Sequence, residues 1–255
     1  MAAANDPLCR PAKDEELADP LATVDAAGWL GKSIAGQNLL CLAAGGGRQS
    51  SLYAAAGAKV TVVDLSGAML ELDRRVAAER GFSVRLFEAS MESLPMLHDA
   101  EFDIVIHPVS SCYVPNVLPV FHEVARVTRP GGIYVSQHKQ PASLQGSIDP
   151  LPNGGYAMTN AYYRDSAIPS PASTLPSARR LREHGAVEFL HRWEQLIGGM
   201  CRAGFMIEDL TEPMHAKQAE KGTFADRAKY FPPYVRIKAR RRGQAINSSA
   251  LWLPE

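Results

Sequence analysis

The sequence predicts an α/β protein built on a doubly wound parallel sheet, and two observations carry this prediction. Short apolar runs alternate with stretches of helical periodicity from residue 39 to about residue 139. Three consecutive glycines, Gly45 to Gly47, separate the first apolar run from the first helical stretch. Right-handed crossovers between such units give a parallel sheet, which binds ligands at the carboxyl ends of its strands.

The first unit reads as a buried strand at 39–43, a glycine turn, and a helix at 48–57. Glycines accept positive φ angles and lack Cβ atoms, so backbone N–H groups can approach a ligand across the turn. The next apolar run, 59–64, ends in Asp64, at the separation where such folds place an acid on ribose hydroxyls. The glycine turn and Asp64 together predict a nucleotide-type cofactor.

Each later element has its own local signal. The helix at 66–80 begins with the capping residue Ser66 and stops at Gly81. Helices at 115–128 and 186–204 are predicted from apolar residues at helical spacing, and Asp14 to Leu30 reads as one or two helices ending near Gly31. The remaining strands are expected at 83–89, 101–107, 133–139, 205–213 and 234–241.

A segment rich in Pro, Ser, Gly and Tyr interrupts the regular pattern at 139–186. It is too long for a simple connection, and long loops in compact domains are mostly functional or disordered, so we expect a lid. The predicted organisation is an N-terminal, partly helical segment at 1–30, a domain at 31–242 with this insertion, and a tail at 243–255. Residues 1–13 are expected to be disordered.

Composition limits the partners. Lys+Arg and Asp+Glu are both 27, so the formal net charge is zero and predicts neither a nucleic-acid nor a membrane partner. The four cysteines are scattered without CxxC spacing, which suits reduced thiols and a cytoplasmic location. The N-terminal stretch has no long apolar core, so neither a signal peptide nor a membrane span is expected.

Across most of residues 30–242, the order of elements and the motifs resemble those of class I S-adenosylmethionine-dependent methyltransferases. The first-strand motif matches at Cys41, Ala43, Gly45 and Gly47, and the acid after the second strand matches Asp64. The phrase EVARVTRPGG, before the fifth strand, is the most specific match. The resemblance implies a Rossmann-like sheet of seven strands, with the seventh inserted antiparallel and helices on both faces.

The resemblance also implies a site. S-adenosyl-L-methionine would be bound and S-adenosyl-L-homocysteine released. We expect a small molecule as methyl acceptor and a monomer or homodimer as the assembly. The implied cofactor-binding residues are Ala43, Gly45, Gly46, Gly47, Asp64, Leu65, Met69, Ser90, Met91, His107 and Pro108. Two positions depart from the family pattern: the usual first-strand acid is Cys41, and the acid that usually faces the adenine amino group is Ser90.

Methyl transfer from a sulfonium needs chiefly an aligned, dry pair of reactants, and a base is needed only when the acceptor must lose a proton. His107, His138 and Tyr113 are the candidate catalytic residues, and for either histidine a structural role is equally open. Tyr162, Tyr163 and Tyr234 could line an acceptor pocket or serve as packing. A metal site is not expected, because the one weak grouping, His184, Glu188 and His191, lacks metal-ligand spacing.

Two other functions remain open from the sequence. A nicotinamide-dependent oxidoreductase could use the same type of sheet, but Ser50 stands where the dinucleotide fingerprint wants a third glycine. A non-catalytic sensor that binds an adenosyl nucleotide is suggested by Cys41 and Ser90, since both replace expected acids. Titration with S-adenosylhomocysteine and with NAD distinguishes a methyltransferase from the oxidoreductase. A methyl-transfer assay distinguishes an enzyme from the non-catalytic sensor.

Overall fold

A computed structural model gives the structure of the protein and describes residues 10–171, 173, 176–183, 185–215 and 218–243. The expectations for residues 1–9, for His184 and for the tail beyond residue 243 lie outside the described residues. Within the described part of the chain, no helix combines the length and the apolar character needed to cross a membrane.

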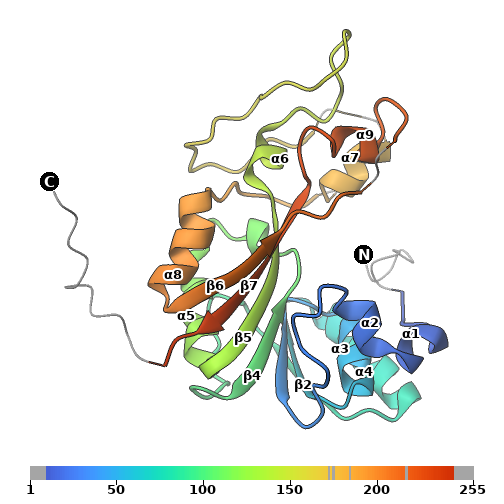
Figure 1. Cartoon of the computed structure of the whole chain (residues 1–255), viewed down its shortest axis with the longest axis vertical. Helices are drawn as coiled ribbons and strands as arrows, with labels where there is room; N and C mark the ends of the chain where they lie inside the picture. Colours follow the sequence, from blue (N-terminus) through green and yellow to red (C-terminus); the bar gives the residue numbers. More distant parts are fainter. Residues whose placement is uncertain (1–9, 172, 174–175, 184, 216–217, 244–255) are drawn as a thin grey trace, which may run out of the picture.

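Seven strands form one sheet in the order β3-β2-β1-β4-β5-β7-β6 (Figure 1). β1 to β5 run parallel, and β7 runs antiparallel to both of its neighbours, β5 and β6. This confirms the predicted doubly wound sheet with an antiparallel seventh strand. The strands are β1 (Asn38–Leu42), β2 (Lys59–Asp64), β3 (Val84–Glu88), β4 (Phe102–His107), β5 (Thr128–Lys139), β6 (Phe205–Thr211) and β7 (Tyr234–Arg241).

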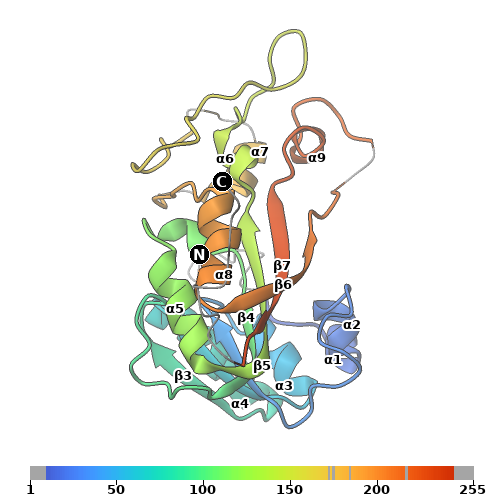
Figure 2. The ribbon, with the colours of Figure 1, turned by 60° about the vertical axis from the view of Figure 1, so that its left-hand side comes forward.

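Helices cover both faces of the sheet, as Figures 1 and 2 show. The helices are α1 (Asp14–Ala18), α2 (Pro20–Val24), α3 (Arg48–Ala55), α4 (Gly67–Arg80), α5 (Leu118–Val127), α6 (Pro141–Gln145), α7 (Pro176–Leu181), α8 (Gly199–Arg202) and α9 (Phe224–Arg227). On one face, Tyr53 of α3 and Leu70 of α4 pack in a core cluster with Cys41. On the other, Phe121 of α5 and Met200 of α8 pack with β4 and β5. Both faces of the central strands are therefore dry, which explains their unbroken apolar sequences.

The caps of α4 are as predicted. The Ser66 hydroxyl accepts a hydrogen bond from Met69 N at 3.3 Å, and Gly81 ends the helix at φ 69°. The N-terminal helices stop earlier than expected, at Val24, because the Asp25 carboxylate accepts hydrogen bonds from Trp29 N and Leu30 N at 2.9 and 2.7 Å and turns the chain. Such side-chain bonds offer the backbone an alternative to helix.

The predicted helix at 186–204 is wrong over its first third. Ile168 N donates to Glu188 O and Phe189 N donates to Cys112 O, each at 2.7 Å, so this backbone is bonded to distant segments instead of to itself. Helix begins only near Trp193, with a π-helical turn, η4 (Glu194–Gly198), that leads into α8. The consequence is that Glu188 and His191 lie on an extended segment.

A layer of irregular structure stands beyond the carboxyl ends of the strands, where Figures 1 and 2 show α6, α7 and α9 close together. Two connections build it: the insertion after β5, which includes α6 and α7, and the β6–β7 connection, which contains α9. Arg227 of α9 joins them, donating to Ser143 O at 2.7 Å and Gly146 O at 3.1 Å at the end of α6. The sequence indicated only the first connection.

Candidate cofactor and acceptor site

The turn after β1 requires its glycines for two different reasons. Gly46 and Gly47 have φ angles of 122° and 82°, a region that side chains rarely adopt, and even Ala43 lies at φ 48°. A Cβ on Gly45 would lie 2.8 Å from Met69 Cβ and 3.0 Å from the Asp64 Oδ2 atom. The missing side chain lets the turn sit directly against α4 and the end of β2.

Asp64 lies beside this turn, as the sequence predicted. Its Oδ2 atom accepts a hydrogen bond from Gly45 N at 2.8 Å, and its Oδ1 atom accepts one from Ser66 N at 2.9 Å. These two bonds fix the carboxylate between the ends of β1 and β2. Each carboxylate oxygen still has a lone pair with which it can accept a hydrogen bond from a hydroxyl group.

Asp73 is a site residue that the sequence reading missed. This carboxylate on α4 is fully buried, and it accepts hydrogen bonds from Gly46 N at 2.8 Å and from the Ser50 hydroxyl. Burial raises the pKa of Asp73, while the hydrogen bonds from Ser50 and the glycine turn oppose that rise. The signal was present, because Asp73 stands in the apolar stripe of its helix between Leu70 and Val76.

The carboxylates change the role that we predicted for the turn. The N–H groups of Gly45 and Gly46 point to Asp64 and Asp73, so these two donors are engaged within the chain and do not face a ligand. Asp73 also lies near Cys41 on β1: burial raises the pKa of the Cys41 thiol, and the negative charge of Asp73 adds to that rise. A buried carboxylate therefore stands close to the position where the resembling family carries its first-strand acid.

The end of β3 supplies a second unexpected carboxylate. The Ser90 hydroxyl donates to Glu92 Oε2 and accepts from Glu92 N, both at 3.2 Å. Met91 is buried, whereas the Leu65 side chain after β2 is 72% exposed and free to cover a flat ligand. The edge at which we expected Ser90 and Met91 thus also carries the Glu92 carboxylate.

Two histidines come together at the ends of β4 and β5. His107 bonds the Tyr134 hydroxyl through Nδ1 and the Ser110 hydroxyl through Nε2, both at 2.7 Å. His138 bonds the Ser111 hydroxyl through Nδ1 at 2.7 Å and the Ser136 hydroxyl through Nε2 at 2.9 Å. The two ring centroids are 6.0 Å apart, edge to face. One buried hydrogen-bond network therefore holds the loop after β4.

Burial governs the protonation of these groups. It lowers the pKa of His107 to about 4 and lowers the pKa of His138 well below its ordinary value. Both imidazoles are neutral near pH 7, with both ring nitrogens engaged. Tyr113 donates to Glu183 Oε2 at 2.6 Å, and burial raises its pKa. A direct part for these three residues in catalysis stays a prediction.

The stability of the protein is expected to fall as the pH drops from about 6.5 towards 4. In that window the unfolded chain binds a proton on His107 that the folded chain does not. The free energy of unfolding therefore falls by up to about 1.4 kcal/mol for each pH unit of acidification. Thermal denaturation from about pH 7 to about pH 5 measures the slope. His107→Gln should reduce it and His122→Gln, at an exposed position, should not; an unchanged slope in His107→Gln would contradict the assignment.

An ion-pair cluster lies next to this network. Lys139 Nζ is 2.6 Å from Glu188 Oε1, and Arg182 Nε is 2.5 Å from Glu188 Oε2. His191 Nε2 bonds Ser111 O at 2.9 Å, which ties the extended segment to the loop after β4. Among the residues that the structure describes, no cluster of His, Cys, Asp and Glu could hold a metal ion.

The predicted tyrosines do not gather in one place. Tyr234 lines a cavity beside Lys139, whereas the Tyr162 hydroxyl accepts a hydrogen bond from Trp193 N at 3.0 Å. Tyr163 is 80% exposed, and its ring lies beneath the guanidinium group of Arg192. Tyr162 and Tyr163 are therefore engaged elsewhere, and the three tyrosines do not line one pocket.

The glycine turn, the acid at the end of β2 and the sheet order define a class of protein, and comparisons with known proteins agree. Residues 40–136 match the methyltransferase domain family. The uncharacterized methyltransferase YbaJ of Bacillus subtilis is 34% identical over 180 residues, which cover 70% of this chain and 69% of that protein. The chain belongs to the class I S-adenosylmethionine-dependent methyltransferases.

Solved structures share the fold. A methyltransferase from Mesorhizobium loti superposes with a TM-score of 0.67 at 20% identity, over 88% of this chain and 100% of that chain. Geranyl diphosphate C-methyltransferase from Streptomyces coelicolor, solved with S-adenosyl-L-homocysteine, gives a TM-score of 0.56 at 18% identity, over 92% and 86%. S-adenosylmethionine is therefore the cofactor of this class, which answers the nicotinamide alternative.

The residues present fit this cofactor. The glycine turn places no Cβ atom against Asp64, and the Leu65 side chain that follows Asp64 is exposed. Among the described residues, no cationic side chain pairs with Asp64, which is partly exposed beside the turn, whereas Asp73 is fully buried beneath it. The negative charge of Asp64 suits a ligand that carries positive charge.

Proposed function

We propose that this protein transfers the methyl group of S-adenosylmethionine to a small-molecule acceptor held between the ends of β4 and β5 and the insertion 139–186. The observation that carries the proposal is the Asp64 carboxylate, fixed against the glycine turn by Gly45 N and Ser66 N. When bound, the cofactor supplies an activated methyl group on a sulfonium. The chain has to orient donor and acceptor and exclude water, which can be worth about 7 to 11 kcal/mol.

We assign the roles as follows. Asp64 accepts hydrogen bonds from the ribose hydroxyls, Leu65 and Met69 flank the adenine, and Ser90 with Met91 meets its edge. Glu92 joins Ser90 there, because its carboxylate can also accept a hydrogen bond from the adenine amino group. The backbone of His107 and Pro108 faces the methyl end, and the glycine turn with Ala43 supports the methionine end.

The histidine network supports the acceptor side of this proposal. His107 and His138 hold Ser110 and Ser111 through short hydrogen bonds, so they fix the loop after β4 on which an acceptor would lie. Near pH 7 a neutral imidazole with both ring nitrogens in hydrogen bonds is better suited to holding the loop in place than to removing a proton from the acceptor. We therefore propose His107 and His138 as positioning residues and keep Tyr113 as the candidate that reaches the acceptor.

Asp64→Ala is expected to weaken S-adenosylhomocysteine binding by about 100-fold or more. A hydrogen bond to a charged group contributes about 1.5 to 3 kcal/mol, two are lost, and each 1.4 kcal/mol is tenfold in affinity. Isothermal titration calorimetry of the full chain measures the change. Glu71→Ala, which removes an exposed acid of α4, is the matched control and should bind normally; equal affinity of the two variants would refute the Asp64 role.

Transfer of radiolabelled methyl groups from S-adenosylmethionine into a whole-cell extract, which is afterwards separated into small metabolites and macromolecules, tests the activity itself. A labelled small molecule that depends on active protein is the expected result. Tight cofactor binding without any labelled product would favour the alternative of a non-catalytic sensor. The assignment of a small-molecule acceptor fails if label enters only macromolecules.

A further inference from the structure

Five cationic and aromatic side chains from separate segments meet beyond the carboxyl ends of the strands. Arg180 belongs to α7, His215 follows β6, Phe224 belongs to α9, and Tyr234 and Arg236 belong to the first part of β7. α7 and α9 contact each other at this end of the sheet (Figure 1). We call these five residues the cation–aromatic cluster. Ligands of doubly wound sheets bind at this end.

Ring contacts hold the cluster together. Arg180 Cζ lies over the Phe224 ring, 4.2 Å from its centroid. The His215 ring lies edge-on to two rings, with its centroid 4.9 Å from that of Phe224 and 6.2 Å from that of Tyr234. Partial burial lowers the pKa of His215, and the positive charges of Arg180 and Arg236 add to that shift. Both guanidinium groups are therefore close to one imidazole.

Neither arginine of the cluster pairs with an acid among the residues that the structure describes. Arg236 Nε donates to the side-chain oxygen of Gln137 at 2.9 Å, and Arg180 packs on the Phe224 ring. Both partners are neutral. The side chains of Arg180 and Arg236 are exposed, so a molecule in solution can reach them.

The rest of β7 shows how this strand neutralises its other cations. Lys238 and Arg240 share the Glu208 carboxylate. Arg236 lies on the same face of β7, because even-numbered residues alternate with buried odd-numbered ones along the strand. Glu212, which follows β6, accepts a hydrogen bond from an amide and forms no ion pair with Arg236. Positive charge on β7 is therefore left without a carboxylate only at the end of the sheet where ligands bind.

The free N–H groups of the two arginines suit an anion. A guanidinium has five N–H donors in one plane, and it pairs with carboxylates and phosphates through two parallel hydrogen bonds. Packing on Phe224 fixes the plane of the Arg180 group, and the bond to Gln137 uses only the Nε donor of Arg236. The Nη groups of both arginines remain for a ligand.

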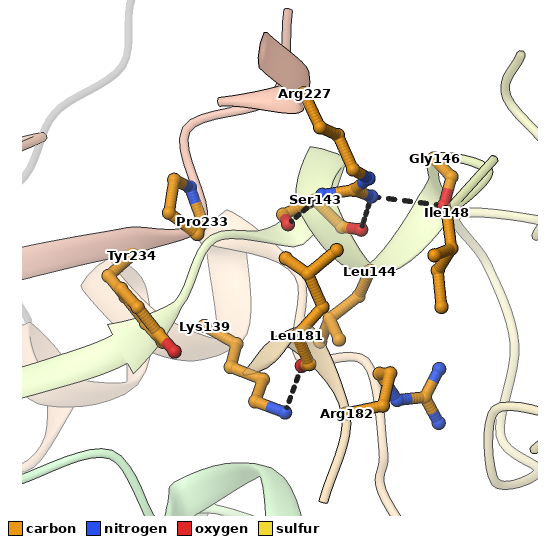
Figure 3. Close-up of a pocket in the computed structure, with 10 residues that line it drawn as sticks. All are labelled: Lys139, Ser143, Leu144, Gly146, Ile148, Leu181, Arg182, Arg227, Pro233 and Tyr234. Carbon is orange, nitrogen blue, oxygen red and sulfur yellow. Dashed lines mark hydrogen bonds between the residues drawn. The ribbon is translucent and has the colours of Figure 1, made fainter. Parts of the chain in front are cut away.

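The cavity beside Tyr234 is not this site (Figure 3). Lys139, Arg182 and Arg227 line it, but the space in it for the centres of water-sized molecules is about 20 Å³. Such a space holds about one water molecule. An organic anion therefore needs the exposed arginines of the cluster and not these enclosed cations.

The cluster lies near the place where transfer is expected. Gln137, which holds Arg236, follows Ser136 on β5, and Ser136 lies opposite His107 at the end of β4. β7 is two strands away from β4, which is about 10 Å at the ordinary spacing of strands. A small acceptor at the end of β4 can span this distance.

We propose that the cation–aromatic cluster binds an anionic group of the methyl acceptor, a carboxylate or a phosphate, through Arg180 and Arg236. This inference rests on the proposed methyltransferase function and narrows its substrate class to small organic anions. Two positive charges without a carboxylate attract an anion and repel a cationic acceptor, and they give a neutral acceptor no such advantage.

NMR titration of the full chain, saturated with S-adenosylhomocysteine, tests the proposal with three probes: benzoate, phenyl phosphate and the neutral benzamide. Saturable binding of at least one anion is expected, with benzamide bound roughly fivefold or more weakly. Which anion binds more tightly distinguishes a carboxylate site from a phosphate site. Equal binding of benzamide and the anions, or no anion binding, would overturn the proposal.

Variants locate the binding. Arg180→Gln and Arg236→Gln should each weaken anion binding about three- to tenfold, because each removes one charged fork of donors. Arg240→Gln is the matched control, since Glu208 already neutralises this arginine of the same strand, and it should leave binding unchanged. Anion binding unaffected by both cluster variants would contradict the site, and so would an equal loss in all three variants.

Methyl transfer gives a separate outcome. Labelled small molecules from a whole-cell extract, separated by anion exchange, should appear in the anionic fraction. Label confined to neutral or cationic products would overturn this inference and leave the methyltransferase function intact. Anion binding that depends on Arg180 and Arg236, without any labelled product, would support the cluster as an anion site and count against the proposed function.

Discussion

Glu188→Gln is expected to lower the free energy of unfolding by about 3 to 5 kcal/mol. Glu188 is fully buried and is the shared counter-charge of Lys139 and Arg182, so the neutral amide leaves two cations in the interior without a carboxylate. Removal of one partner from a buried ion pair costs about this much, because the remaining charge stays desolvated. For a chain of this size the melting temperature should fall by roughly 6 to 20 °C.

Glu208→Gln is the matched control. Glu208 also pairs with one lysine and one arginine, Lys238 Nζ at 3.2 Å and Arg240 Nη2 at 3.0 Å, but its side chain is 24% exposed. Solvent screens such a pair, and its loss should cost about 1 kcal/mol or less. Chemical denaturation of both variants measures the difference; similar losses would show that burial does not set the importance of the Glu188 cluster.

Asp73→Ala is expected to reduce both stability and cofactor affinity. It leaves Gly46 N and the Ser50 hydroxyl without their buried acceptor, and each unsatisfied group costs about 1 to 3 kcal/mol. The turn that these bonds hold in place also carries Gly45 against Asp64. We therefore expect a loss of roughly 2 to 6 kcal/mol in unfolding free energy and at least tenfold weaker binding of S-adenosylhomocysteine.

A second substitution separates this role from simple packing. Cys41 lies close enough to Asp73 for the carboxylate to influence its thiol, so an acid at position 41 can reach the same region from β1. In the Asp73→Ala background, Cys41→Asp should restore part of the affinity, whereas Cys41→Ser should not. Calorimetry on the wild type, Asp73→Ala, Cys41→Asp and the double variant forms a double-mutant cycle. Strictly additive effects would exclude the idea that Asp73 stands in for a first-strand acid.

The central part of the fold could be predicted because its signals are local. Apolar runs, helical spacing and the caps at Ser66 and Gly81 depend on neighbouring residues, and the structure confirms the strands and α4. The glycine turn and Asp64 were predictable for the same reason. Each strand end is fixed by its own sequence, and parallel strands bring their carboxyl ends to one edge.

The helix expected at 186–204 shows where local reasoning fails. The apolar spacing favoured helix, but the backbone of Glu188 and Phe189 hydrogen-bonds to Ile168 and Cys112 instead. These bonds place Glu188 beside Lys139, 49 positions earlier in the sequence. Tertiary contacts outweighed helical preference, which is weak for a single turn.

The sequence by itself determined the order of strands and helices along the chain, the glycine turn and the acid beside that turn. These features depend on periodicity and backbone freedom, which are properties of short stretches. Tertiary structure alone decided which buried charges meet. Asp73 reaches Gly46 across 27 positions, and Lys139, Arg182 and Arg227 gather at one cavity from three separate segments. No short sequence pattern predicts such contacts between distant charged residues, since the free energy of a buried charge depends on every group packed around it.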